Sequence, residues 1–97
     1  MKILKRPELS NATDLGDRNP ETFSIPSTEQ LSNIKVNDVV FVCANRERFK
    51  ATVIELYSES KFICEISSQL ILTHTHGLKL NDIILVKSEN IYSVIKH

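Results

Sequence analysis

The stretch from Ile34 to Val42 reads Ile-Lys-Val-Asn-Asp-Val-Val-Phe-Val, and it returns from Leu78 to Val86 as Leu-Lys-Leu-Asn-Asp-Ile-Ile-Leu-Val. Asn and Asp tolerate left-handed backbone dihedrals and bond their own backbone, so each Asn-Asp pair predicts a turn. The apolar run after each turn is mostly β-branched or aromatic and fits a strand buried on both faces, although its periodicity also allows a buried helix segment. Two copies indicate two strands of one β core, since a repeat array needs about three or more units.

The size and charge of the chain limit the classes of protein to which it can belong. Its 97 residues predict one domain with a core of modest size. Lys plus Arg and Asp plus Glu balance at 12 each, so the chain lacks the basic excess that favours nonspecific nucleic-acid or membrane binding. No apolar run is long enough for a secretory signal or a membrane helix. With two cysteines and no signal, we expect reduced thiols and a cytoplasmic protein that does not bind membranes.

The amino-terminal part of the chain differs in composition from the rest. Residues 1–22 carry few apolar side chains after a possible short edge strand at the start, which predicts a flexible or irregular lead. Residues 23–97 are expected to form a single small β domain. Ser27 followed by Gln30 has the spacing of a capping box, which predicts one short helix near residues 27–33.

Polar turns separate a series of apolar or alternating runs, each of which predicts a short strand. In the second run, Phe49, Ala51 and Val53 are expected to share the face that points to the core. Five or six such strands predict a mainly-β fold, a small antiparallel barrel or a curled sheet, with an SH3-like barrel as the first choice. An OB-type barrel is less favoured because its usual longer helix is missing. The predicted strands cover residues 39–44, 48–57, 62–66, 69–72, 82–87 and 91–95, of which the last segment could instead form a 3₁₀ turn.

Several of these segments together resemble a known family. The segment from Glu47 to Phe49 opens a strand, and the stretch from His76 to Lys79 leads into the turn at Asp82. This arrangement resembles a family of small bacterial proteins marked by a Gly-Glu-Arg-(Met/Phe)-Trp-Val motif and a downstream Leu-Lys-x-Gly-Asp turn. The family has no assigned activity, so the resemblance implies a compact mainly-β domain and no particular mechanism.

The chain departs from the motifs of that family at particular positions. Arg46 stands in place of the first glycine of the motif, and Lys50 stands in place of its tryptophan. Asn37 and Asn81 replace the glycine that usually precedes the aspartate of the turn. The chain is therefore similar to a divergent member, and any role that depends on the tryptophan ring is in doubt.

His74 and His76 are the residues that most resemble metal ligands. At this spacing in an extended segment, their side chains point the same way and could share a metal ion. Cys43 and Cys64 could supply thiolates, but the ligand spacing of a structural zinc site is missing. Both cysteines lie in apolar runs, where free cysteine is usually a core residue. We therefore expect no metal and no other cofactor.

An enzymatic role finds no support in the sequence. A nucleophilic cysteine needs an exposed, activated thiolate, which does not fit these apolar runs. The acidic residues are scattered singly through turns, and two distant glycines cannot build a phosphate-binding loop. We therefore expect no catalytic residues and no enzyme activity.

A basic tip precedes and opens the second predicted strand. Arg46, Arg48 and Lys50 alternate, so their side chains are expected to project from one face, with Glu47 on the other face beside Phe49. A solvated edge that discourages strand pairing explains this pattern most simply. The functional interpretation is a contact patch for an acidic protein surface or a nucleic-acid backbone.

Two functional hypotheses follow. The first is a non-catalytic cytoplasmic protein-binding module of the immunity, inhibitor, adaptor or accessory type, present as a monomer or weak homodimer. The alternative is a small β-barrel protein that binds nucleic acid through the basic edge, although the phenylalanines are expected in the core and offer no stacking surface. The candidate binding residues are Arg46, Glu47, Arg48, Lys50, His74 and His76.

Overall fold

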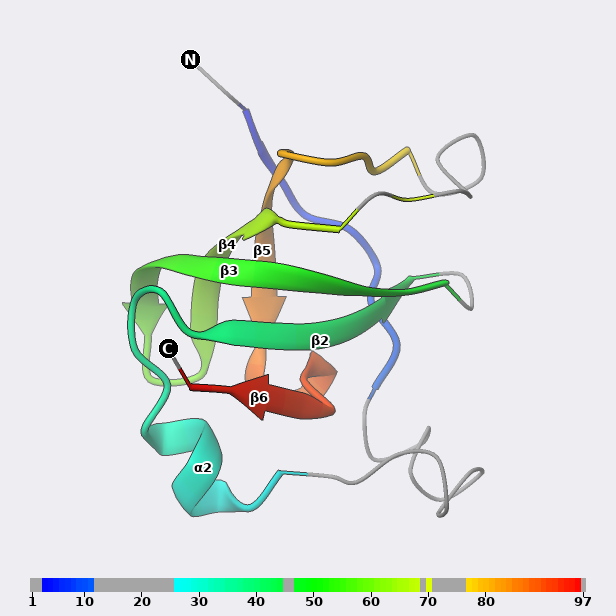
Figure 1. Cartoon of the computed structure of the whole chain (residues 1–97). Helices are drawn as coiled ribbons and strands as arrows, with labels where there is room; N and C mark the ends of the chain where they lie inside the picture. The colour runs from blue at the N-terminus through cyan, green and yellow to red at the C-terminus, as the bar shows by residue number, and fades with distance from the viewer. Residues whose placement is uncertain (1–2, 12–25, 45–46, 69, 71–76, 97) are drawn as a thin grey trace.

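The fold was analysed on a computed structural model, which describes residues 3–11, 26–44, 47–68, 70 and 77–96. Strands dominate this part of the chain, so the predicted mainly-β class is confirmed (Figure 1). In sequence order the elements are β1 (Leu4–Lys5), α2 (Thr28–Ser32), β2 (Val39–Ala44), β3 (Glu47–Ser58), β4 (Lys61–Ile66), β5 (Ile83–Lys87), the 3₁₀ turn η1 (Ser88–Asn90) and β6 (Ser93–Ile95).

The strands form one mixed sheet in the order β1-β5-β4-β3-β2-β6. Most neighbours are antiparallel, but β1 runs parallel to β5 and places Leu4 opposite Ile83. The prediction of a purely antiparallel sheet is therefore wrong at this edge. The parallel pairing has its reason in the connectivity. No hairpin turn links β1 to β5, and the long chain between them allows a parallel arrangement.

The sheet is curved but open. Figure 1 shows β5 running across the direction of β2 and β3, so the sheet twists strongly along its length. Its two end strands are β1 and β6, and within the described residues they do not pair with each other. Of the strand predicted at residues 69–72, Leu70 is buried outside any strand, and the other positions lie outside the described residues.

The repeated Asn-Asp stretches form the same turn twice. Asn37 has a φ of 81° and Asn81 has a φ of 73°, the left-handed geometry that asparagine tolerates. The N–H of Asn37 donates to the carbonyl of Val53 in β3 at 2.8 Å, and the N–H of Asn81 donates to the carbonyl of Ile66 in β4 at 2.9 Å. The two turns therefore flank the central β3–β4 pair on opposite sides.

Each turn is closed by its own aspartate. The Oδ2 atom of Asp38 accepts the N–H of Lys35 at 2.9 Å, and Oδ2 of Asp82 accepts the N–H of Lys79 at 3.0 Å. In the other direction, each aspartate N–H donates to the carbonyl of the same lysine at 3.1 Å. The identical bonds explain why the same residue pattern precedes both β2 and β5.

The core lies on the inner face of the sheet. Its members alternate along the strands, as predicted for β3 and β4, and each full burial contributes about 1.5–3 kcal/mol. Leu9 and Leu31 pack against its margin. The buried members from these two strands are Phe49, Ala51, Val53, Phe62, Cys64 and Ile66.

A second, smaller cluster occupies the other face of β2. It consists of Cys43 and Tyr92, with Phe41 packed against them and only partly buried. Phe41, which the sequence predicts in the core, thus packs against this smaller core cluster and is only partly buried. The first apolar run alternates between two environments, and only its inward residues, such as Val40 and Val42, are completely buried.

The segments that surround the sheet are fixed by polar contacts. Ser27 Oγ accepts the N–H of Gln30 at 3.1 Å, and Gln30 Oε1 accepts the N–H of Ser27 at 2.8 Å, which is a capping box at the start of α2. The first part of the predicted lead joins the domain through β1 and through Ser10, whose N–H donates to the carbonyl of Cys43 at 2.8 Å. Residues 12–25 lie outside the described residues.

Candidate functional site

The basic tip predicted from the sequence is partly described. Glu47, Arg48 and Lys50 open β3, with Arg48 and Lys50 exposed and Phe49 buried between them. The predicted alternation is therefore confirmed for these residues. Arg46 lies outside the described residues, so the described part of the tip consists of Glu47, Arg48 and Lys50.

The described basic side chains lie beside the second cluster. Arg48 pairs with Cys43 across the β2–β3 ladder, and Lys50 pairs with Phe41. The rings of Phe41 and Tyr92 have centroids 6.1 Å apart and are tilted by 51°. Burial raises the pKa of Tyr92 to about 12, although the charge of Arg48 acts in the opposite direction. Aromatic surface thus adjoins the basic positions, which the sequence did not reveal.

Of the candidate metal-binding and nucleophilic residues, the structure describes the two cysteines. His74 and His76 lie outside the described residues. Cys43 and Cys64 are free and buried, and burial raises the pKa of the Cys64 thiol to about 12. Within the described ranges, no group of three or more His, Cys, Asp or Glu side chains could hold a metal ion. The described cysteines are core residues, as expected from their apolar runs.

A different surface stands out at the far end of β3. From Ile54 to Ser58 every residue of the strand is exposed, whereas the first half of β3 alternates between buried and exposed. Three of these residues are large and apolar: Ile54, Leu56 and Tyr57 are 43%, 50% and 53% exposed. We call the segment Ile54–Ser58 the distal edge. It combines apolar surface with backbone in strand geometry.

The distal edge lacks a strand on one side. In the β2–β3 ladder, β2 reaches only as far as Thr52, while β4 pairs along the other side of β3 as far as Ser58. No second strand among the described residues continues beyond β2. Backbone groups on that side of the distal edge therefore have no ladder partner in the described part of the chain, which is the condition under which another chain can add a strand.

Two irregularities shape this edge. The β3–β4 register shifts between Val53 and Glu55 and again between Leu56 and Ser58, so Ile54 and Tyr57 fall at bulge positions. Bulges increase local twist and interrupt regular pairing. The distal edge is therefore twisted, and a partner strand must be short enough to follow it.

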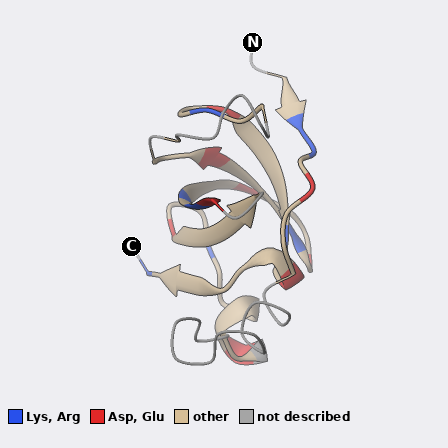
Figure 2. Ribbon diagram, turned by 90° about the vertical axis from the view of Figure 1, so that its right-hand side faces the viewer, with Lys and Arg blue, Asp and Glu red and all other residues tan. Residues whose placement is uncertain are grey.

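Charged positions are dispersed over the rest of the molecule. Figure 2 shows lysine, arginine, aspartate and glutamate scattered along the ribbon, without one extended block of either sign. This agrees with the formal net charge of zero. The described part of the chain therefore shows no extended block of one sign, the feature that draws in polyanions or polycations.

Comparisons with known proteins returned nothing similar. No family model matches the chain, and no curated protein or solved structure matches it. The resemblance to the Gly-Glu-Arg-(Met/Phe)-Trp-Val family therefore stays a prediction. None of the helices in the described residues has the length and apolar character needed to span a membrane.

Proposed function

We propose that this chain is a non-catalytic, cytoplasmic protein-binding module, of the immunity, inhibitor, adaptor or accessory type, that recognises its partner through the distal edge. The observation that carries the proposal is the exposure of Ile54, Leu56 and Tyr57 on a strand segment that no other described strand pairs with on one side. The cytoplasmic assignment rests on the two free cysteines, which fit a reducing compartment. The buried thiol of Cys64 supports a non-catalytic role.

An SH3-like arrangement of the strands in this open, curved sheet is part of the proposal. Strands β2 to β5 follow one another as antiparallel neighbours, a 3₁₀ turn follows β5, and β6 then returns to pair with β2. This connectivity supports an SH3-like arrangement, to which β1 adds a further edge strand. In this chain β3 has 12 residues and β2 has 6, so β3 extends past β2 and leaves one side of the distal edge without a paired strand among the described residues.

We commit to one kind of occupant, a short extended segment of another protein. Strand addition supplies main-chain hydrogen bonds along the edge, and alternate side chains of the segment contact the apolar surface. Glu55 and Glu59 are exposed, and neither forms an ion pair with another described residue. Complementary charge in the partner therefore requires Lys or Arg beside its apolar residues.

A second copy of this chain suits the distal edge less well. Two copies that pair along Ile54–Ser58 bring Glu55 of both copies into one two-stranded ribbon, where like charges repel. The bulges at Ile54 and Tyr57 also oppose regular pairing of one edge with itself. A basic segment of a different protein avoids both costs.

The proposal is tested by capture from nuclease-treated lysate with tagged wild type, Leu56→Lys and Leu80→Lys. Leu80 is a matched control because it is also an exposed leucine, 38% exposed, and it lies in the second Asn-Asp turn. We expect wild type and Leu80→Lys to retain the same discrete protein, and Leu56→Lys to lose it. Retention by Leu56→Lys contradicts the proposal. A wild-type homodimer in sedimentation that Leu56→Lys dissociates also contradicts it, since the edge then binds a second copy.

One observation favours the alternative of nucleic-acid binding. The partly buried Phe41 and the ring of Tyr92 adjoin Arg48 and Lys50, so aromatic and basic groups meet on one face. Stacking beside cations is a common way to bind single strands. In this alternative, affinity for RNA or DNA oligomers falls steeply with salt and is lost in Lys50→Glu. Binding that does not change with salt contradicts it.

A further inference from the structure

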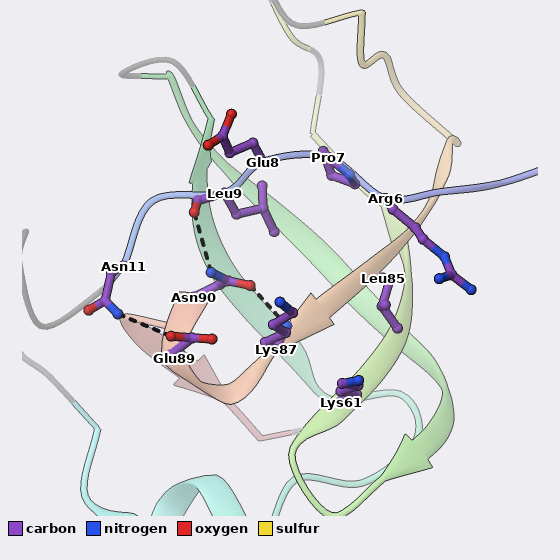
Figure 3. A pocket seen from close by; sticks show the side chains of 10 residues that line it. All are labelled: Arg6, Pro7, Glu8, Leu9, Asn11, Lys61, Leu85, Lys87, Glu89 and Asn90. Atoms are coloured by element: carbon purple, nitrogen blue, oxygen red, sulfur yellow. Dashed lines mark hydrogen bonds between the residues drawn. The ribbon is translucent and has the colours of Figure 1, made fainter.

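A pocket of about 390 Å³ lies between the amino-terminal segment and the carboxyl-terminal part of β5. Figure 3 shows Arg6, Lys61 and Lys87 on one part of its lining, with Glu8 and Glu89 towards the other part. The basic side chains come from three separate segments: the stretch after β1, the start of β4 and the end of β5. The fold places them around one pocket, although they are distant in the sequence.

The amino-terminal segment is fastened at both ends of this pocket. Before the pocket, Lys5 Nζ lies 2.8 Å from Asp82 Oδ2. After it, the N–H of Ser10 donates to the carbonyl of Cys43 at 2.8 Å, and Nδ2 of the buried Asn90 lies 3.4 Å from the carbonyl of Ser10. The wall of the pocket is therefore held in place by the sheet and by η1.

Two of the basic residues are direct neighbours in the sheet. Lys61 pairs with Lys87 in the β4–β5 ladder. Like charges directly opposite each other destabilise an antiparallel pair. Among the described residues neither ammonium group, nor the Arg6 guanidinium, has an ion pair with an acid. Three cationic side chains without an ion-pair partner among the described residues therefore line one pocket.

We propose that this pocket binds the phosphate group of a small molecule, a role separate from partner recognition at the distal edge. Arginine and lysine bind phosphate oxygens by charge-assisted hydrogen bonds. Glu8 and Glu89 on the other side of the pocket can accept hydrogen bonds from ligand hydroxyl groups. The volume falls in the range of about 300–1,000 Å³ typical of small-molecule sites. The chemistry fits inorganic phosphate or a sugar phosphate.

The test measures the thermal unfolding midpoint of the full chain against ligand concentration at constant ionic strength. The proteins are wild type, Lys87→Gln, Lys61→Gln and the control Lys35→Gln, whose exposed lysine lies outside the pocket. The ligands are inorganic phosphate and ribose 5-phosphate, with chloride as the reference salt. Wild type and Lys35→Gln should show the same saturable rise, since a ligand that binds the folded state raises its stability.

In Lys87→Gln, the half-saturating concentration should rise by about tenfold or more, the usual effect of losing a hydrogen bond to a charged group. In chloride alone, this variant should be about as stable as wild type, because Lys87 is exposed and forms no ion pair with another described residue. The ligand with the lower half-saturating concentration identifies the source of the phosphate. No saturable rise with either ligand, or an unchanged half-saturating concentration in both Lys87→Gln and Lys61→Gln, overturns the proposal.

Discussion

Lys5 and Lys96 lie far apart in the sequence and hold equivalent aspartates of the two repeated turns. Lys5 Nζ lies 2.8 Å from Asp82 Oδ2, and Lys96 Nζ forms the corresponding ion pair with Asp38 Oδ2. Each lysine also donates to the backbone carbonyl just before the repeated stretch. The carboxylates are only 12% and 5% exposed, so both need partners that replace water. In each copy, the aspartate that closes the turn is thus paired with a lysine that lies outside the repeated stretch.

Removing these lysines should destabilise the fold to different degrees. Lys5→Met should lower the free energy of unfolding by about 1 kcal/mol, and Lys96→Met by about 1–2 kcal/mol, because Asp38 is the more buried of the two aspartates. Urea denaturation measures both. Lys35→Met is the control, because the Lys35 side chain is exposed and forms no ion pair in the described part of the chain. Equal effects of all three variants contradict the assignment.

Acid should weaken the fold through Asp82. Burial alone raises the pKa of this carboxyl, but hydrogen bonds from Lys5 and Lys79, together with their charges, outweigh burial and lower the pKa below its ordinary value of 3.8. The carboxylate therefore adds stability above pH 3.8, and this contribution is lost as the pH falls through the lowered pKa. Unfolding free energies between neutral pH and pH 2 should fall less in Asp82→Asn than in wild type. Parallel curves for the two proteins disprove this role.

The left-handed turn positions should tolerate glycine better than alanine. Asn37 has a φ of 81°, which a residue with a β-carbon adopts only at a cost. Asn37→Ala should lower stability by about 1 kcal/mol, whereas Asn37→Gly should change it by only a few tenths. Chemical denaturation of both variants checks the difference. An alanine variant as stable as the glycine variant shows that backbone geometry is not what selects asparagine here.

Native cysteines should react slowly with thiol reagents. With its pKa raised to about 12, the thiol of Cys64 has a thiolate fraction on the order of one in ten thousand at pH 8, and Cys43 is buried as well. Alkylation should therefore proceed at the rate of unfolding and become fast in denaturant. The rate of iodoacetamide labelling, followed by mass spectrometry, measures this. Rapid labelling of Cys64 in the native protein shows instead that its thiol is accessible and reactive.

Local patterns predicted much of the fold. The Asn-Asp turns, the strand beginning at Val39 and the inward face of Phe49 depend on residues close in sequence, where turn chemistry and alternation act directly. The pairing of Lys5 with Asp82 was not predictable in this way, since nothing local relates residues so far apart.

The candidate sites could not be predicted from the alternation of apolar and polar residues along a strand. Alternation indicates which face of β3 a residue occupies, but it does not show that β2 stops beside Thr52 and leaves Leu56 half exposed. Likewise, Lys61 and Lys87 are unremarkable until the β4–β5 register places them opposite each other. The sequence singled out Lys50 and its neighbours because clustered charge is visible without a register.

Hydrogen exchange of backbone amides in the distal edge tests the central claim most directly. The measurement compares the free protein with the complex that it forms with its partner. The partner is the protein that wild type captures from the lysate and Leu56→Lys does not. If a partner segment adds a strand, the amides from Ile54 to Ser58 should be slowed in the complex, while those of β6 stay unchanged. Slowed exchange around Arg48 and Lys50, with no change from Ile54 to Ser58, contradicts the proposed recognition surface.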